Sequence, residues 1–191
     1  MTPDEVLQFF RDTGALLEGH FLYASGRHGR QFLQAARVLQ FPDITERLCS
    51  ALAARFQNAA VDLVIGPATG GIILAYETAR RMRCRAAFTE KDGAGGMALK
   101  RGFSLKPNTR VLVVEDIITT GGSVAQSITH LKDRGAEIIG VGALIDRSAG
   151  EARFPVRFEA LAQIAMESWP PDSCVLCRGG VPLIDPDDIM V

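Results

Sequence analysis

The stretch that decides the fold is "VLVVEDIITTGGS", residues 111–123. Four apolar residues, typical of a buried parallel strand, run directly into two carboxylates, Glu115 and Asp116. Two more apolar residues follow, and then a turn of hydroxyl side chains and glycines leads into a predicted helix. A surface turn before a capped helix would explain the second half only. The adjacent carboxylates after a buried strand therefore favour a binding site.

The chemistry of this stretch points to a sugar phosphate. In open parallel α/β sheets, ligands bind beyond the carboxyl ends of the strands, and we expect Glu115 and Asp116 at such an end. The glycines of 119–123 allow close backbone approach, and the free N–H groups of a helix start favour a phosphate. Carboxylates for hydroxyl groups, followed by a phosphate pocket, match the layout of a ribose 5-phosphate. The other common phosphate motifs, G-x-x-x-x-G-K-[ST] and G-x-G-x-x-G after a strand, do not occur.

Strands and helices alternate on both sides of this stretch. Such alternation predicts right-handed βαβ units and a parallel sheet core flanked by helices, in one α/β domain over 1–191. Thr2 and Pro3 predict a capped N-terminal helix that ends near Gly14. The further predicted helices are 42–56, 71–82 and 122–134, and the predicted strands are 61–65, 85–90, 110–114 and 137–146.

Composition and charge limit the class of protein. Apolar residues make up 47% of the 191 residues, charged residues 23%, and the net charge is −1. This balance gives no general attraction to nucleic acid or to an anionic membrane. No apolar run approaches the ~20 residues of a membrane span, and the N-terminus lacks the pattern of a secretory signal. We therefore expect a cytoplasmic protein with neither nucleic acid nor membrane as a partner.

The cysteines do not predict a disulfide framework in a chain of this length. Cys174 and Cys177 form a C-x-x-C near the C-terminus. A zinc site would need two further ligands, and neither a second C-x-x-C nor a nearby histidine pair is present. A packed turn is the favoured interpretation, and we expect no protein-held metal. His28, within "SGRHGR", is equally compatible with a substrate-facing and a structural position.

The chain resembles a known family at several places. "VLVVEDIITTGGS" resembles the phosphoribosyl-pyrophosphate signature of type I phosphoribosyltransferases. The chain is similar to the orotate phosphoribosyltransferase branch over about 14–150, through "GHFLYASGRHGRQFLQAARVL", "GPATGGIILAYE", "FTEKDGAGGMALKRGF" and "GALIDRS". The resemblance implies a type I phosphoribosyltransferase fold, with a small hood formed by about 1–40 and 150–191.

The resemblance also implies an activity. Orotate and 5-phosphoribosyl 1-pyrophosphate (PRPP) would give orotidine 5′-phosphate and pyrophosphate, a step of pyrimidine synthesis. Mg²⁺ would accompany the pyrophosphate and be held mainly by PRPP. The protein would be a homodimer in which a loop completes the neighbouring subunit's site.

Site residues follow from the same motifs. Lys91, Glu115 and Asp116 are implied as catalytic, with the carboxylates on the ribose hydroxyls and Lys91 on the leaving group. Thr119 and Arg147 are implied to contact orotate. The residues implied to bind PRPP are Glu115, Asp116, Ile117, Ile118, Thr119, Thr120, Gly121, Gly122, Ser123, Lys91 and Arg85.

Two positions depart from the family pattern. Ala24 and Gly70 stand where many members carry lysines. The candidates to replace these charges are Arg81, Arg85, Lys100 and Arg101. We expect the glycine-rich, basic segment 91–102 to be a mobile excursion or loose hairpin that closes over the site and excludes water.

Two other classes of protein share this fold. A non-catalytic PRPP-binding regulator would be expected to carry a DNA-binding module or a strongly basic face, neither of which this sequence indicates. A purine phosphoribosyltransferase is the other alternative. "LIDRS" favours orotate, because Arg147 suits an anionic base with a carboxylate.

Overall fold

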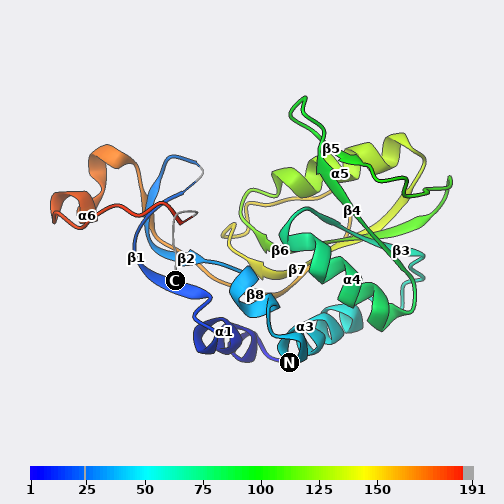
Figure 1. Cartoon of the computed structure of the whole chain (residues 1–191), viewed down its shortest axis with the longest axis horizontal. Coiled ribbons are helices and arrows are strands. Elements are labelled where there is room, and N and C mark those ends of the chain that lie inside the picture. The colour runs from blue at the N-terminus through cyan, green and yellow to red at the C-terminus, as the bar shows by residue number, and fades with distance from the viewer. Residues whose placement is uncertain (24, 187–191) are drawn as a thin grey trace.

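The computed structural model describes residues 1–23 and 25–186. Its larger part is a six-stranded sheet with helices on both faces, and its smaller part is a three-stranded sheet that lies to one side (Figure 1). Strands from both ends of the chain lie side by side in the smaller part. The expected α/β fold with a small hood is confirmed.

The core sheet has the strand order β5-β4-β3-β6-β7-β8. All neighbouring pairs are parallel except β4 and β5, which form an antiparallel hairpin. The strands are β3 (Leu63–Pro67), β4 (Arg85–Lys91), β5 (Met97–Leu99), β6 (Arg110–Ile118), β7 (Glu137–Asp146) and β8 (Phe158–Gln163). The four predicted strands are therefore present, and β5 and β8 were not predicted.

Strand β6 corrects one expectation. The sequence analysis ended this strand at residue 114, with the acidic pair beyond it. In the structure β6 continues to Ile118, because β7 runs to Asp146 and pairs with it there. Glu115 is opposite Ala143 in this register. The acidic pair therefore lies on the last third of a paired strand, which fixes its backbone.

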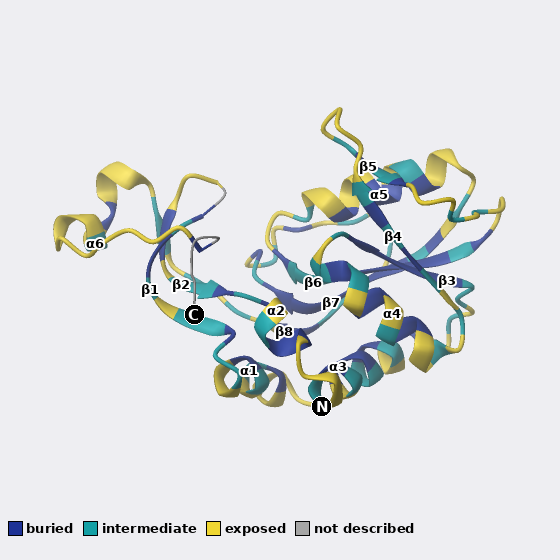
Figure 2. Ribbon diagram, viewed as in Figure 1, coloured by how far each residue is buried: buried dark blue, intermediate teal, exposed yellow. Residues whose placement is uncertain are grey.

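Helices cover the two faces of the sheet, and the alternation of side chains along β6 shows how. Leu112 and Val114 point into a cluster with α3 (Pro42–Arg55) and α4 (Gly70–Met82). Val111 and Val113 point into a second cluster with α5 (Gly122–Asp133). Because successive side chains of a strand face opposite sides, one strand serves both cores. The central strands β3, β6 and β7 are accordingly buried along most of their length (Figure 2).

The N-terminal helix α1 (Pro3–Asp12) is capped as predicted. Thr2 Oγ1 accepts from Glu5 N at 3.3 Å, and Thr2 N donates to Glu5 Oε2 at 2.6 Å. Val6 and Phe10 are fully buried in the α3–α4 cluster, as is Val38 of the short helix α2 (Ala36–Leu39). Residues of the N-terminal segment thus also support the core sheet.

The hood is the sheet β1-β2-β9 with the segment that follows it. Its strands are β1 (Leu16–Leu22), β2 (His28–Leu33) and β9 (Ser168–Trp169), and all pairings are antiparallel. The 3-10 turn η1 (Pro171–Ser173) and the short helix α6 (Val175–Arg178) follow. Within the described ranges, no helix has the length and apolar character needed to cross a bilayer.

Candidate active site

The candidate site lies where the parallel strands end. Strands β3, β4, β6 and β7 end at Pro67, Lys91, Ile118 and Asp146, and their parallel pairing brings these ends to one edge of the sheet. The hood contacts this edge, since Tyr23 of the hood stacks against Arg147. The structure therefore brings together most of the residues that the sequence singled out.

The acidic pair is half-buried and lacks a cationic partner. No Lys or Arg of the described ranges forms an ion pair with Glu115 or Asp116. Asp116 Oδ1 accepts from the neighbouring Ile117 N at 2.6 Å, and Glu115 Oε1 accepts from Asp116 N at 3.1 Å. Burial, together with the charge of Asp116, raises the pKa of Glu115 to about 9. Burial also raises the pKa of Asp116. The pair is poised for a ligand that donates hydrogen bonds.

The following turn forms a small pocket at the start of α5. Gly121 has φ +75°, and a Cβ on it would lie 2.8 Å from Phe154 Cζ, so a side chain is excluded there. The side chain of Ile118 is 1% exposed, so this residue can offer a ligand only backbone groups. The pocket is lined by Glu115, Ile117, Ile118, Thr119, Thr120, Gly121, Gly122, Ser123 and Val124. Free N–H groups and hydroxyls around such a pocket suit a phosphate.

The glycine turn after β3 lies directly against the acidic pair. A Cβ on Gly66 would lie 2.2 Å from the carbonyl oxygen of Gly71, so these backbones approach as only glycines allow. A Cβ on Gly70 would lie 2.0 Å from Asp116 Oδ2. At the position where many family members carry a lysine, any side chain would therefore require the Asp116 carboxylate to move.

Lys91 lies at the end of β4, where the β4–β5 hairpin begins. Met97 and Leu99 are buried and anchor the hairpin, and Asp92 Oδ1 accepts from Ala94 N and Gly96 N across its tip. Of the two expectations for 91–102, a mobile excursion or a loose hairpin, the structure shows a hairpin, and its two apolar residues anchor it. The Lys91 side chain is exposed, and the structure gives it no hydrogen bond or ion pair within the described ranges.

The other basic candidates divide into two groups. Arg101 pairs with Glu90 at 2.7 Å, and Lys100 Nζ donates to the Lys91 carbonyl, so both lie on the hairpin. Arg85 begins β4, about 20 Å from Lys91 at the usual rise of a strand, and contacts Ser104. Arg85 therefore lies at the opposite end of β4 from Lys91 in its own chain.

Arg81 belongs with Arg85. It lies near the end of α4, at the edge of the sheet where the strands begin, and it pairs with Glu46 at 3.2 Å. Ala24, the other departure from the family pattern, lies outside the described residues.

Arg147 lies beside the phosphate turn. The backbone N–H of Arg147 donates to Ile118 O at 2.8 Å, and its guanidinium lies over the Tyr23 ring, 4.3 Å from the ring centroid. Burial lowers the pKa of Arg147. Asp146, a conceivable ion-pair partner, instead accepts Ser148 N at 2.8 Å. The guanidinium is thus held by a ring and left without a carboxylate among the described residues, as recognition of an anionic ligand requires.

Sequence reasoning missed the contribution of the hood. Tyr23 was not singled out, although it positions Arg147, and Tyr23 OH donates to Gln31 O. A Cβ on Gly29 would lie 2.0 Å from Tyr23 OH, so the glycine makes room for this ring. His28 is 6% exposed and faces His20 rather than the carboxyl ends of the strands. No local pattern signals these contacts, because they form between strands.

Comparisons with known proteins agree with this geometry. The family described as "Phosphoribosyl transferase domain" matches residues 35–158. An orotate phosphoribosyltransferase of Desulforamulus reducens is 50% identical over 186 residues, 97% of each chain. One from Thermus thermophilus is 48% identical over 94% of this chain and 98% of its own.

Solved structures give the same fold. Orotate phosphoribosyltransferase from Aeropyrum pernix matches with a TM-score of 0.69 and 27% identity, over 83% of this chain and 93% of its own. Adenine phosphoribosyltransferase from Thermoanaerobacter pseudethanolicus matches with a TM-score of 0.61 and 18% identity, over 70% of this chain and 88% of its own. The latter likeness concerns the fold alone.

Proposed function

The chain belongs to the phosphoribosyl transferase family, and we propose that it is an orotate phosphoribosyltransferase. It would transfer the phosphoribosyl group of PRPP to orotate, giving orotidine 5′-phosphate and pyrophosphate. The observation that carries this assignment is the 50% identity to an orotate phosphoribosyltransferase over 97% of both chains. The position of Arg147 beside the phosphate turn supports it independently.

The donor would lie along β6 and the turn after it. In this arrangement Glu115 and Asp116 accept hydrogen bonds from the two ribose hydroxyls, and the pocket of 119–123 takes the 5′-phosphate. The turn 66–71 lies against the same carboxylates, as the closeness of Gly70 to Asp116 requires, and so faces the pyrophosphate. Thr119 and Arg147 face the base, with Arg147 on the orotate carboxylate.

The chemistry asks the protein for positioning and charge rather than for a covalent step. As the bond from the anomeric carbon to pyrophosphate breaks, the sugar gains positive charge and pyrophosphate gains negative charge. Lys91 can neutralise the leaving group from the hairpin, where its charge is not taken up by a described partner. A hairpin that closes over the site would also exclude the water that hydrolyses the donor.

Mg²⁺ would enter with the pyrophosphate of PRPP. Hard oxygen ligands suit this ion, and the turn 66–71 offers backbone groups but no carboxylate. The carboxylate next to this turn, that of Asp116, is assigned to ribose. The residues therefore fit a metal that the donor's own phosphates hold, and the metal supplies charge neutralisation there.

A homodimer in the cytoplasm is part of the proposal. Ile73 and Tyr76, three residues apart on α4, are 49% and 67% exposed, and a second subunit would cover this apolar surface. The β4–β5 hairpin projects from the body of the subunit (Figure 1), which would let Lys91 reach a neighbouring site. Sedimentation of the wild type and of Tyr76→Arg tests the interface, and we expect the variant to sediment as a smaller species.

One assay tests the assignment. Purified protein is mixed with PRPP, Mg²⁺ and either orotate, adenine or hypoxanthine, and pyrophosphate release is measured. We expect turnover with orotate only. Turnover with a purine base would assign the chain to the other branch of the family. Binding of PRPP without turnover of any base would favour a regulator.

A further inference from the structure

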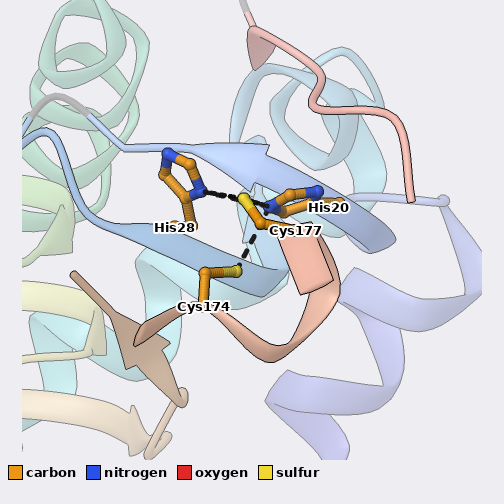
Figure 3. A group of neighbouring side chains, drawn as sticks. All are labelled: His20, His28, Cys174 and Cys177. Atoms are coloured by element: carbon orange, nitrogen blue, oxygen red, sulfur yellow. Dashed lines mark hydrogen bonds between the residues drawn. The ribbon is translucent and has the colours of Figure 1, made fainter. Parts of the chain in front are cut away.

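Four side chains with metal-binding atoms meet in the hood, away from the candidate active site. They are His20 of β1, His28 at the start of β2, and Cys174 and Cys177 around α6 (Figure 3). All four ligand atoms lie within 4.8 Å of one another. The sequence analysis looked for histidines close to the C-x-x-C in the sequence and therefore missed His20 and His28. His20 is 154 residues from Cys174 along the chain.

The distances between these atoms fit a tetrahedron around one ion. His20 Nε2 lies 3.2 Å from His28 Nδ1, 3.4 Å from Cys174 Sγ and 3.7 Å from Cys177 Sγ. His28 Nδ1 lies 3.2 Å from Cys177 Sγ. With Zn–N near 2.0–2.1 Å and Zn–S near 2.3 Å, a tetrahedral site separates two nitrogens by about 3.3 Å and a nitrogen from a sulfur by about 3.6 Å.

The hydrogen bonds around the cluster orient its ligand atoms. Val181 O lies 2.8 Å from His20 Nδ1, and a carbonyl can only accept, so Nδ1 carries the proton. The lone pair of His20 Nε2 then faces the two sulfurs and His28. A carbonyl that holds the far nitrogen of a ligating histidine is the usual support of a metal site. The backbone N–H groups of Cys177 and Leu176 donate to the Cys174 sulfur.

Burial and charge indicate a closed site. His20 and Cys174 are each 1% exposed and His28 is 6% exposed, whereas Cys177 is exposed, so three of the four ligands would be shielded from water. Two thiolates and two neutral imidazoles balance the charge of a divalent cation. Sulfur and imidazole ligands in a tetrahedron suit zinc, and four protein ligands leave no open position for catalysis.

The segment that carries the cysteines has little else to hold it. Helix α6 has no buried residue, and Val181, Leu183 and Ile184 after it are 41%, 44% and 39% exposed (Figure 2). Its links to β1 are the hydrogen bonds of Ile184 with His20 O and Leu22 N and that of Val181 with His20. A metal would join this segment to the β1–β2 hairpin, next to Tyr23.

We propose that His20, His28, Cys174 and Cys177 bind one structural Zn²⁺ that fastens the C-terminal segment to the hood. All four cysteines of the chain are free thiols in the structure, so the ligands are available. The ion has no part in the transfer reaction. Its role is to order the hood and, through Tyr23, to keep Arg147 in place.

The test measures metal in the full chain, expressed without a histidine tag. The protein is reduced, treated with excess Zn²⁺ and desalted, and zinc is counted by elemental analysis. We expect one zinc per chain in the wild type and in Cys84→Ser, which removes a thiol outside the cluster. We expect less than about a tenth of that in Cys177→Ser, whose exposed side chain allows substitution without disturbing the core.

Two further measurements keep the proposal open to refutation. Co²⁺ bound in place of zinc should give the visible absorption of a tetrahedral site with thiolate ligands, and His28→Asn should weaken or abolish these bands. A chelator should lower the Tm of the wild type and leave that of Cys177→Ser unchanged. The proposal would be overturned if the wild type takes up no zinc after reduction. This holds also for protein that was isolated with a Cys174–Cys177 disulfide and then reduced. Retention of one zinc by Cys177→Ser would also overturn it.

Discussion

The edge of the core sheet and the hood cluster are built in opposite ways. The first takes its carboxylates and phosphate pocket from consecutive residues, 115–123, on one strand, one turn and one helix start. The second takes two histidines from a hairpin and two cysteines from a segment about 150 residues further on. Both gather polar groups in half-buried surroundings, but only the first is a local feature of the chain.

Because of this difference, we expect substitutions at the core edge to affect activity and substitutions in the hood cluster to affect stability. The carboxylates at the core edge are held by a paired strand and have no cationic partner among the described residues, so a ligand that donates hydrogen bonds would stabilise them. The hood cluster joins segments with few apolar contacts, so its loss should loosen the fold. Changes at the core edge should thus remove activity and leave the hood's zinc in place.

The largest effect is expected from the double variant Glu115→Gln/Asp116→Asn. Hydrogen bonds to charged groups contribute about 1.5–3 kcal/mol each, so donor use should fall by roughly tenfold or more at ~1.4 kcal/mol per decade. The measurement is kcat/KM for PRPP, with circular dichroism and zinc content as controls for the fold. Near-normal donor kinetics in the folded variant would make the pair structural.

Lys91→Ala should reduce turnover more than donor binding. Negative charge grows on pyrophosphate as the bond breaks, so a contact with Lys91 strengthens in the transition state. We expect kcat to fall on the order of tenfold or more, with a smaller change in the KM for PRPP. Steady-state kinetics test this, with Lys106→Ala as the matched control because Lys106 is an exposed lysine at the edge where the strands begin. Equal effects of the two variants would contradict the assignment.

Mixing two inactive variants tests which subunit Lys91 serves. Lys91→Ala and Asp116→Asn are mixed under conditions of subunit exchange. If the hairpin acts across the interface, each mixed dimer has one intact site and activity returns. If Lys91 acts within its own subunit, both sites of the mixed dimer stay defective and no activity returns.

A more selective effect is expected from Arg147→Lys. Lysine keeps the charge but loses the planar fork that suits a carboxylate and stacks on Tyr23. The KM for orotate should rise by about tenfold while the KM for PRPP holds, as initial rates at saturating second substrate will show. Tyr23→Leu should shift the same constant by less. An equal rise in both constants would indicate that Arg147 supports the fold of the site.

Sequence reasoning succeeded where information is local. The order of strand, acidic pair and turn is contiguous in 111–123, and the capping box of α1 spans four residues. It failed where contacts between distant segments determine the structure. Strand β6 extends to Ile118 because it pairs with β7, and Tyr23 of the hood stacks on Arg147 at the end of the core sheet. The sequence also left open at which end of β4 Arg85 lies, because a basic residue next to a strand does not reveal this.

The smallest effect, and the one that tests the contrast most directly, is on stability. Because the pKa of Glu115 is raised in the folded chain, the unfolded chain releases its proton at lower pH. The free energy of unfolding should therefore fall as the pH rises from the usual range of a carboxyl toward 9. Glu115→Gln removes this loss. The free energy of unfolding of the variant should equal that of the wild type near about pH 5 and exceed it increasingly up to about pH 9.

Each ~1 kcal/mol of this gain would correspond to roughly 2–4 °C in Tm for a chain of this length. Thermal unfolding followed by circular dichroism at several pH values measures this difference. Glu151→Gln is the control, since it makes the same substitution at an exposed position. If Glu115→Gln is less stable than the wild type at every pH, the carboxylate supports the strand. The core edge would then resemble the hood cluster in being built for stability.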